Sequence, residues 1–222
     1  MKNNENILSL LLELPPDLVE IEEELKNNLY SPKDITSVAC SFAEECFREY
    51  TDFIEEKGRI PLDTELHSTY VYQVCVLLLK YGLEPNMLIG DNPYTEDNIM
   101  NSIYWIDKPC VSADTLKLLL ENGGDPRLWV EGESLYDMVD FDVWYDVNEG
   151  YAHNERYKYI FESRFHFWLV LLGFIAEEGT KEKDYINHEK YTWRIKASGR
   201  NQYEVEIVEK QFSYSRTFSL GY

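Results

Sequence analysis

An internal repeat is the feature that most constrains how this chain can fold. Residues 77–86 read LLLKYGLEPN and residues 118–127 read LLLENGGDPR, so two similar segments lie 41 residues apart. Seven of the ten positions match in kind, among them a leucine triplet, a glycine, an acidic residue and a proline. The leucines can bury the end of a helix, the glycine can take the left-handed conformation that ends it, and the proline turns the chain into a loop. Repeats of this length are typical of stacked helical units.

Hydrophobic periodicity predicts helices along most of the chain. One or two short helices are expected in residues 3–30, and Ser31 before Pro32 is a typical helix start. We expect that helix to continue to Lys57 and to end at Gly58. Further helices are predicted at about residues 65–81, after Thr95, and at about 112–122, 134–146 and 156–178. In the tail, residues 191–196 and 203–207 alternate apolar and polar side chains and predict a β-hairpin, to which residues 212–218 could add a third strand.

Several of these motifs resemble the ankyrin repeat family. Residues 118–126 are similar to the ending of the family's second helix, whereas Leu66-His67 and residues 132–135 are similar to its helix openings. The period of 41 exceeds the ~33 residues of ankyrin repeats because residues 87–97 form an enlarged loop, so the array is degenerate. The composition also resembles that of uncharacterised bacterial ankyrin-like proteins.

The resemblance and the alternating tail together define the expected fold. It is mainly α, an ankyrin-like stack of helical hairpins with a small C-terminal β-hairpin or three-stranded element. Three domains are expected: an N-terminal helical cap (1–30), an ankyrin-like helical repeat region (31–180) and a C-terminal β element packed on the last helix (185–222).

Charge is distributed unevenly along the chain. Residues 1–150 carry 31 acidic and 10 basic side chains, a net charge of −21, whereas residues 151–222 carry 10 acidic and 11 basic ones. Such a field repels nucleic acid and anionic membranes and speeds the encounter with a basic partner. We therefore expect a basic protein partner, with no direct nucleic-acid or membrane binding, although the acidity could serve solubility alone. Because no apolar run reaches the ~18–20 residues of a membrane span and the first residues lack signal-peptide features, we expect a cytoplasmic protein.

Motifs that carry catalytic chemistry are sparse in this sequence. The cysteines and histidines show no zinc-ligand spacing, and phosphate-loop and nucleophile-elbow motifs are missing. We expect no catalytic residue, no metal and no cofactor. A Cys–His pair that meets only in space stays open as an alternative, although buried structural thiols are the better interpretation of Cys75 and Cys110.

The ankyrin resemblance implies a binding surface made of finger loops and the first helix of each pair. On this chain the fingers are residues 86–95 and 126–134. They contain the candidate binding residues Tyr94, Trp129 and Glu131, with Trp129 as the candidate anchor because tryptophan is enriched in binding hot spots. Either aromatic side chain could instead pack against the neighbouring finger.

An acidic segment at residues 136–146 is the other candidate. Asp137 and Asp140 share one helix face and are candidate binding residues, and paired carboxylates could also hold a cation or act as acid and base. The intervening apolar residues indicate a core-facing stripe with the acids on the solvent side. These apolar residues are Val139, Phe141, Val143 and Trp144.

These observations favour a non-enzymatic protein–protein interaction module whose acidic surface binds a basic protein. A sharper version is an inhibitor or immunity-type protein that masks such a partner. Two alternatives remain: a small metal-dependent or cysteine enzyme on a helical scaffold, and a structural subunit in which the aromatic tail makes a homodimer. The sequence is compatible with a monomer or a homodimer.

Overall fold

The computed structural model describes residues 4–90, 97–106, 111–130, 132–151, 154, 157–175, 181–186, 191–197, 203–209 and 215–219. The prediction of a mainly helical protein is confirmed. The chain divides into two compact units, Met1–Leu135 and Tyr136–Tyr222. The expected three-domain division (1–30, 31–180 and 185–222) stays a prediction.

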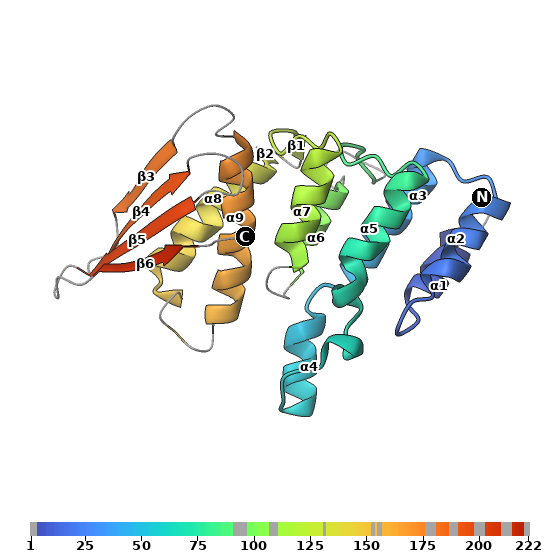
Figure 1. Cartoon of the computed structure of the whole chain (residues 1–222), viewed down its shortest axis with the longest axis horizontal. Helices are drawn as coiled ribbons and strands as arrows, with labels where there is room; N and C mark the ends of the chain where they lie inside the picture. Colours follow the sequence, from blue (N-terminus) through green and yellow to red (C-terminus); the bar gives the residue numbers. More distant parts are fainter. Residues whose placement is uncertain are drawn as a thin grey trace. The chain divides into compact units, whose positions relative to one another are not determined.

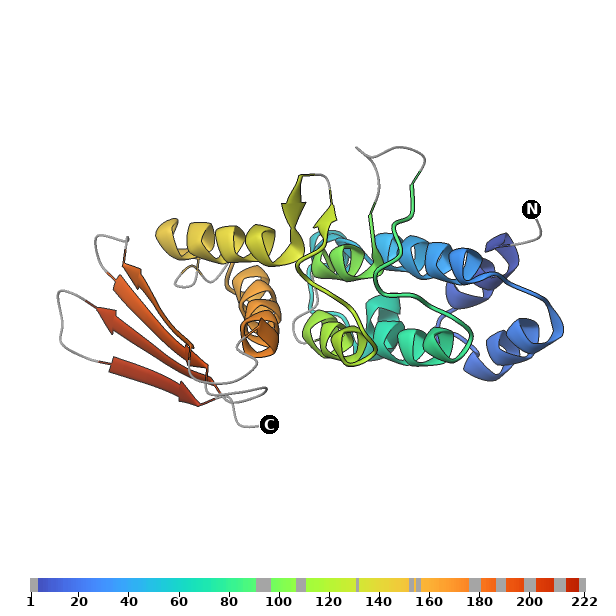
Figure 2. The ribbon, with the colours of Figure 1, turned by 90° about the horizontal axis from the view of Figure 1, so that it is seen from above.

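The first unit is a two-layer stack of helical hairpins. Helices α1, α3 and α6 follow one another in one layer, and α2, α5 and α7 follow one another in the other (Figures 1 and 2). Each helix of the first layer also packs on one of the second, in the pairs α1–α2, α3–α5 and α6–α7. The elements are α1 (Asn4–Leu11), α2 (Leu18–Asn27), α3 (Pro32–Glu45), α4 (Glu49–Lys57), the 3₁₀ helices η1 (Asp63–Glu65) and η2 (His67–Tyr70), α5 (Val71–Lys80), α6 (Ile99–Tyr104), α7 (Val111–Glu121) and the short strands β1 (Trp129–Val130) and β2 (Glu133–Ser134).

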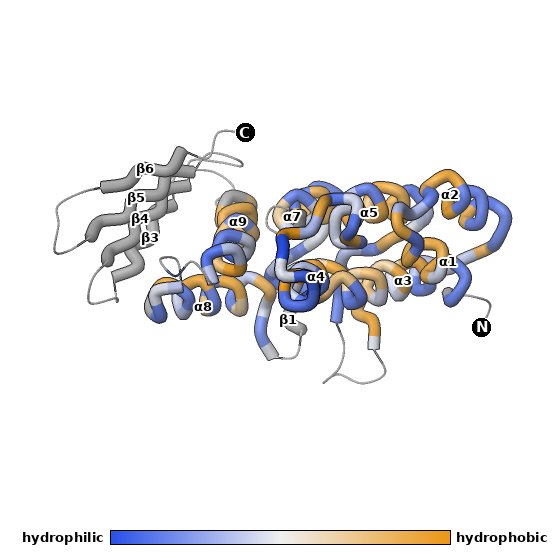
Figure 3. The backbone as a smooth tube through the Cα atoms, turned by 90° about the horizontal axis from the view of Figure 1, so that it is seen from below, coloured by the Kyte–Doolittle hydropathy of each residue, from blue (hydrophilic) through white to orange (hydrophobic). Residues whose placement is uncertain are grey.

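Apolar side chains fill the space between the two layers. The apolar and polar residues alternate along the helices with the helical period, as the hydropathy-coloured tube shows (Figure 3). Burying a leucine or isoleucine contributes about 1.5–3 kcal/mol, so each hairpin depends on its neighbours for stability. Fully buried members of this core include Ile7, Ile21, Ile35, Phe42, Val74, Leu78, Ile99, Ile103, Leu116 and Leu119.

The sequence repeat is also a structural repeat. The backbone N–H of Leu83 donates to the Leu78 carbonyl over 3.0 Å, and 41 residues later the N–H of Gly124 donates to the Leu119 carbonyl over 3.0 Å. Both bonds span the end of a second-layer helix, as in a Schellman cap. The glycine before each donor has a positive φ, 105° at Gly82 and 93° at Gly123.

One side chain joins these two equivalent loops. The Asn86 amide nitrogen donates to the Gly123 carbonyl over 2.9 Å, and its carbonyl oxygen accepts from the Asp125 N–H over 2.7 Å. Successive hairpins are therefore connected by polar contacts at their loops as well as by apolar contacts between their helices.

The helix that starts after Ser31 differs from its prediction. Its start is confirmed by a capping box, in which the Ser31 N–H donates to the Asp34 carboxylate over 2.9 Å. However, the prediction of one helix to Lys57 is wrong, because α3 ends at Glu45 and the left-handed Arg48 (φ 61°) precedes α4. The apolar pattern continues across this break, but α4 contributes no buried residue.

The second unit contains α8 (Leu135–Asn148), which begins at the unit boundary, and α9 (Lys158–Ile175). Four strands form an antiparallel sheet in the order β3-β4-β5-β6, with β4 and β5 in the register that pairs Trp193 with Ile207. The sequence predicted two or three strands, and the strand at 181–186 lies outside that prediction. Packing of this sheet on α9 stays a prediction. The strands are β3 (Lys181–Ile186), β4 (Tyr191–Ala197), β5 (Tyr203–Glu209) and β6 (Ser215–Ser219).

Within the described residues, no helix combines the length and the apolar character needed to cross a membrane.

Candidate interaction surface

The described parts of the two predicted fingers lie on the same side of the first unit. In Figure 2 the strands β1 and β2 and the described residues that lead towards and away from positions 91–96 extend beyond the layer of α1, α3 and α6. Tyr94 and Glu131 lie outside the described residues. The Trp129 backbone pairs with Ser134 across the hairpin, and its side chain lies outside the described part of the structure. The binding role of the two fingers and their candidate anchors stays a prediction.

The acidic side chains of α8 have different environments. Asp137 is exposed, whereas the Asp140 carboxylate accepts a hydrogen bond of 2.9 Å from the Trp168 indole of α9. Asp146 is completely buried and lies 3.1 Å from the Arg164 guanidinium. The expectation that all the acids face solvent is thus wrong for Asp146, and Asp140 has a structural contact.

The core stripe of α8 also differs from the expected one. Val139 and Val143 are buried as predicted, but Phe141 is 59% and Trp144 36% exposed. The buried face follows the spacing Val139, Val143, Val147, which turns Phe141 to the opposite side of the helix. Because α8 carries apolar residues on several sides, the sequence pattern did not identify the buried one.

Burial changes the protonation of one of these acids. It raises the pKa of Asp146 to about 6; the Arg164 charge acts in the opposite direction, and nearby Asp142 raises the pKa further. The ion pair of Asp146 with Arg164 connects α8 to α9 through two contacts of 3.1 and 3.2 Å. Asp146 is therefore a structural residue of the second unit.

A surface cluster that the sequence did not predict lies where α3 and α6 end. The Arg48 guanidinium lies 4.8 Å from the centre of the Phe47 ring, and the Phe47 and Trp105 rings meet edge to face at 6.4 Å. Phe47 and Trp105 are each 39% exposed. We call Phe47, Arg48 and Trp105 the aromatic cluster. Arginine and tryptophan are the side chains most enriched in protein-binding hot spots.

The backbone beside this cluster is held by a half-buried polar network. One Glu49 carboxylate oxygen accepts from both the His67 N–H and the His67 Nδ1, each at 2.8 Å, and the other accepts from the Ser68 N–H at 3.0 Å. His67 Nε2 lies 3.0 Å from the Leu12 carbonyl oxygen. The network joins the residue after α1 to α4 and η2, and its Glu49 directly follows the left-handed residue Arg48.

The cysteines in the described residues are buried. Burial raises the pKa of the Cys40 and Cys75 thiols to about 12 and also raises that of Cys46, so these three are thiols near neutral pH. The Ser68 hydroxyl is buried next to His67, but His67 Nε2 already faces the Leu12 carbonyl. Cys110 lies outside the described residues. Within the described part of the chain, no group of three or more His, Cys, Asp or Glu side chains is arranged to hold a metal ion.

The aromatic cluster could have been only partly found from the sequence. Charged residues surround Phe47 in the sequence, which is a local signal for a surface position, although Phe47 also continues the helical spacing of apolar residues. Its contact with Trp105, 58 positions later, has no such signal. No protein-family model, curated protein or solved structure matches this chain. What the protein does is therefore inferred from its own residues.

Proposed function

We propose that this chain is a non-enzymatic protein-binding module whose acidic helical stack engages the basic surface of a partner protein. The observation that carries the proposal is the aromatic cluster, in which Phe47 and Trp105 are exposed while the adjoining backbone is fixed by the Glu49–His67 network. A rigid, exposed aromatic surface loses little conformational entropy when a partner covers it. Arg48 supplies planar hydrogen-bond donors at the same place.

The charge of the first unit supports a basic partner. Residues 1–135 carry 26 acidic and 10 basic side chains, a net charge of −16. Such a field accelerates the encounter with a cationic protein, and buried aromatic contacts then slow dissociation. In this proposal the acidity provides steering and the aromatic cluster provides a large share of the affinity.

The proposal also includes an ankyrin-like architecture and a more specific biological role. The two helical layers and the capping bonds that recur after 41 residues support an ankyrin-like stack. The β element at the C-terminus would close that stack by packing on its last helix. A cytoplasmic inhibitor or immunity-type protein that masks the basic surface of its partner would have this combination of charge and shape.

The experiment is a capture followed by a titration. Proteins retained from a lysate of the source organism at low salt are washed at about 0.5 M NaCl, where the screening length falls to a few ångströms. The retained partner is purified and titrated calorimetrically against the wild type, Trp105→Ala and Tyr72→Ala. Tyr72 is the matched control because it is 40% exposed on α5 of the same unit.

We expect a basic partner whose binding weakens in salt and falls about tenfold or more in Trp105→Ala, with little change in Tyr72→Ala. Binding that is insensitive to salt, or equal losses in both variants, would contradict the proposal. The homodimer alternative is distinguished by light scattering, since a dimer has twice the 26.3 kDa mass of the chain. Metal content and thiol reactivity of the purified protein test the enzyme alternative.

A further inference from the structure

One segment of the first unit contributes little to its core. We call residues 49–65, which comprise α4, the loop after it and η1, the α4 arm. In Figure 1 α4 extends beyond the ends of the other helices of its unit. None of its nine residues is buried, whereas every α6 residue is. A helix without a buried face gains little from packing, so beyond the contacts of Glu49 with His67 and Ser68 the arm adds little to the stability of the stack.

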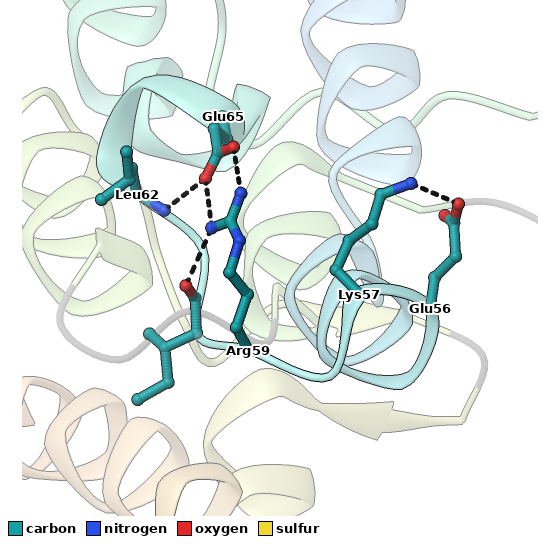
Figure 4. Close-up of polar contacts among 6 residues, drawn as sticks. Glu56, Lys57, Arg59, Leu62 and Glu65 are labelled. Carbon is teal, nitrogen blue, oxygen red and sulfur yellow. Dashed lines mark hydrogen bonds and ion pairs between the residues drawn. The ribbon is translucent and has the colours of Figure 1, made fainter.

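The loop of the arm is held in one conformation by a side-chain brace. The Arg59 guanidinium forms a fork with the Glu65 carboxylate through contacts of 2.8 and 2.6 Å (Figure 4). The Leu62 N–H donates to the same carboxylate over 2.8 Å, and Arg59 also donates to the Ile60 carbonyl over 3.2 Å. The Arg59 guanidinium lies 5.0 Å from the centre of the Phe53 ring, which attaches the loop to α4.

The braced loop exposes two aliphatic side chains. Pro61 is buried, while its neighbours Ile60 and Leu62 are 71% and 64% exposed. These two aliphatic side chains, on either side of Pro61, are apolar surface that the described residues leave largely uncovered. A bidentate arginine–carboxylate pair fixes geometry more than it adds stability at such an exposed place.

The charge around these two side chains is negative. Residues 49–65 carry six acidic and two basic side chains. Both basic residues are paired within the arm, Lys57 with Glu56 at 2.5 Å and Arg59 with Glu65. Exposed carboxylates without an opposite charge at that distance, such as Asp52 and Glu55, give the arm an acidic rim. This rim is complementary to a cationic protein and is repelled by anionic lipid.

We propose that the α4 arm is a docking element that inserts Ile60 and Leu62 into an apolar pocket with a cationic rim on the partner protein. The inference rests on the proposed function, since it names a contact of that same module. It adds a site separate from the aromatic cluster and specifies the chemistry of the partner's surface. The brace lowers the cost of binding by holding the loop in its bound shape before contact.

Site-specific photocrosslinking tests this inference on the full chain. Versions that carry the photoreactive residue p-benzoylphenylalanine in place of Ile60, Trp105 or Val19 are irradiated in lysate of the source organism. Val19 is the matched control because it is an exposed aliphatic residue (68%) elsewhere in the same unit. The crosslinked peptides are identified by mass spectrometry.

We expect position 60 to give one dominant adduct, sensitive to salt, whose crosslinked peptide is apolar with flanking lysine or arginine, and position 19 to give none. An adduct at position 105 without one at position 60 would overturn the docking role of the arm and leave the proposed function standing. No adduct at either position would overturn both. A peptide at position 60 that lacks basic residues would overturn the proposed partner chemistry.

Two variants distinguish the loss of the aliphatic contact with the partner from a change in the conformation of the loop. With the purified partner, the double variant Ile60→Ser/Leu62→Ser should bind at least about tenfold more weakly, and the control Val19→Ser/Leu29→Ser should bind like the wild type. Glu65→Gln removes the charge of the brace but keeps both aliphatic side chains. It should slow association and reduce protection of the Leu62 amide from hydrogen exchange. Unchanged binding in the Ile60/Leu62 variant would refute the inference.

Discussion

At the scale of the residue, Asp146 is a buried acid that makes the stability of the folded protein depend on pH. Its pKa of about 6 in the folded protein exceeds the ~3.9 of an unfolded chain, so ionisation disfavours the folded state. The stability that this group contributes is therefore complete below about pH 4 and is lost as the pH rises through about 6. Asp146→Asn removes this titration. Between about pH 4 and pH 7 we expect the variant to gain up to about 3 kcal/mol relative to the wild type.

Urea unfolding followed by tryptophan fluorescence measures this difference at each pH. Asp137→Asn is the control, since Asp137 is exposed on the same helix. A difference between Asp146→Asn and the wild type that stays flat from pH 4 to pH 7 would show that Arg164 compensates fully for the burial of Asp146.

A second residue-scale prediction concerns Glu49. Its carboxylate accepts three hydrogen bonds from two consecutive residues, His67 and Ser68. In Glu49→Gln one acceptor oxygen becomes a donor that faces another donor, so we expect a loss of about 2 kcal/mol in the free energy of unfolding. Glu45→Gln, at an exposed position of α3, should change little. Equal stability of Glu49→Gln and the wild type would contradict the stabilising role of this network.

At the scale of the element, Asn86 tests how the hairpins are connected. Asn86→Ala removes the two hydrogen bonds to Gly123 and Asp125 without touching the core. Because these contacts are exposed, we expect a loss of about 1 kcal/mol and faster hydrogen exchange at the Asp125 amide. Asn27→Ala, at the exposed end of α2, is the control. Equal exchange rates at Asp125 in the wild type and Asn86→Ala would mean that the loops are held by helix packing alone.

The sequence predicted those elements whose signals are local. Ser31 before Pro32 and the repeated leucine–glycine–proline pattern each specify a helix end through nearby residues, and both ends are found in the structure. The α3–α4 break was missed because Phe47 continues the helical spacing of apolar residues. Whether such a residue is buried depends on a neighbouring element that periodicity does not reveal. The contact of Phe47 with Trp105 and the Arg59–Glu65 brace were missed because they depend on how the chain folds back on itself.

At the scale of the whole molecule, the acidity has two opposite consequences for salt. The net charge of −16 on residues 1–135 repels itself in the folded state but attracts a cationic partner. Raising NaCl from about 20 mM to about 0.3 M should therefore raise the melting temperature of the first unit by a few degrees while it weakens binding. The triple variant Glu23→Gln/Glu45→Gln/Glu121→Gln, at exposed positions, should melt higher at low salt and respond less to NaCl.

Scanning calorimetry and titration of the same samples compare the two effects directly. If salt weakened binding by unfolding the protein, binding and melting temperature would fall together. A melting temperature that rises while binding weakens cannot result from unfolding. It would show that salt screens the attraction to the partner. A melting temperature that falls as NaCl rises would contradict the self-repulsion on which this expectation depends. The loss of binding would then be explained by destabilisation of the folded protein.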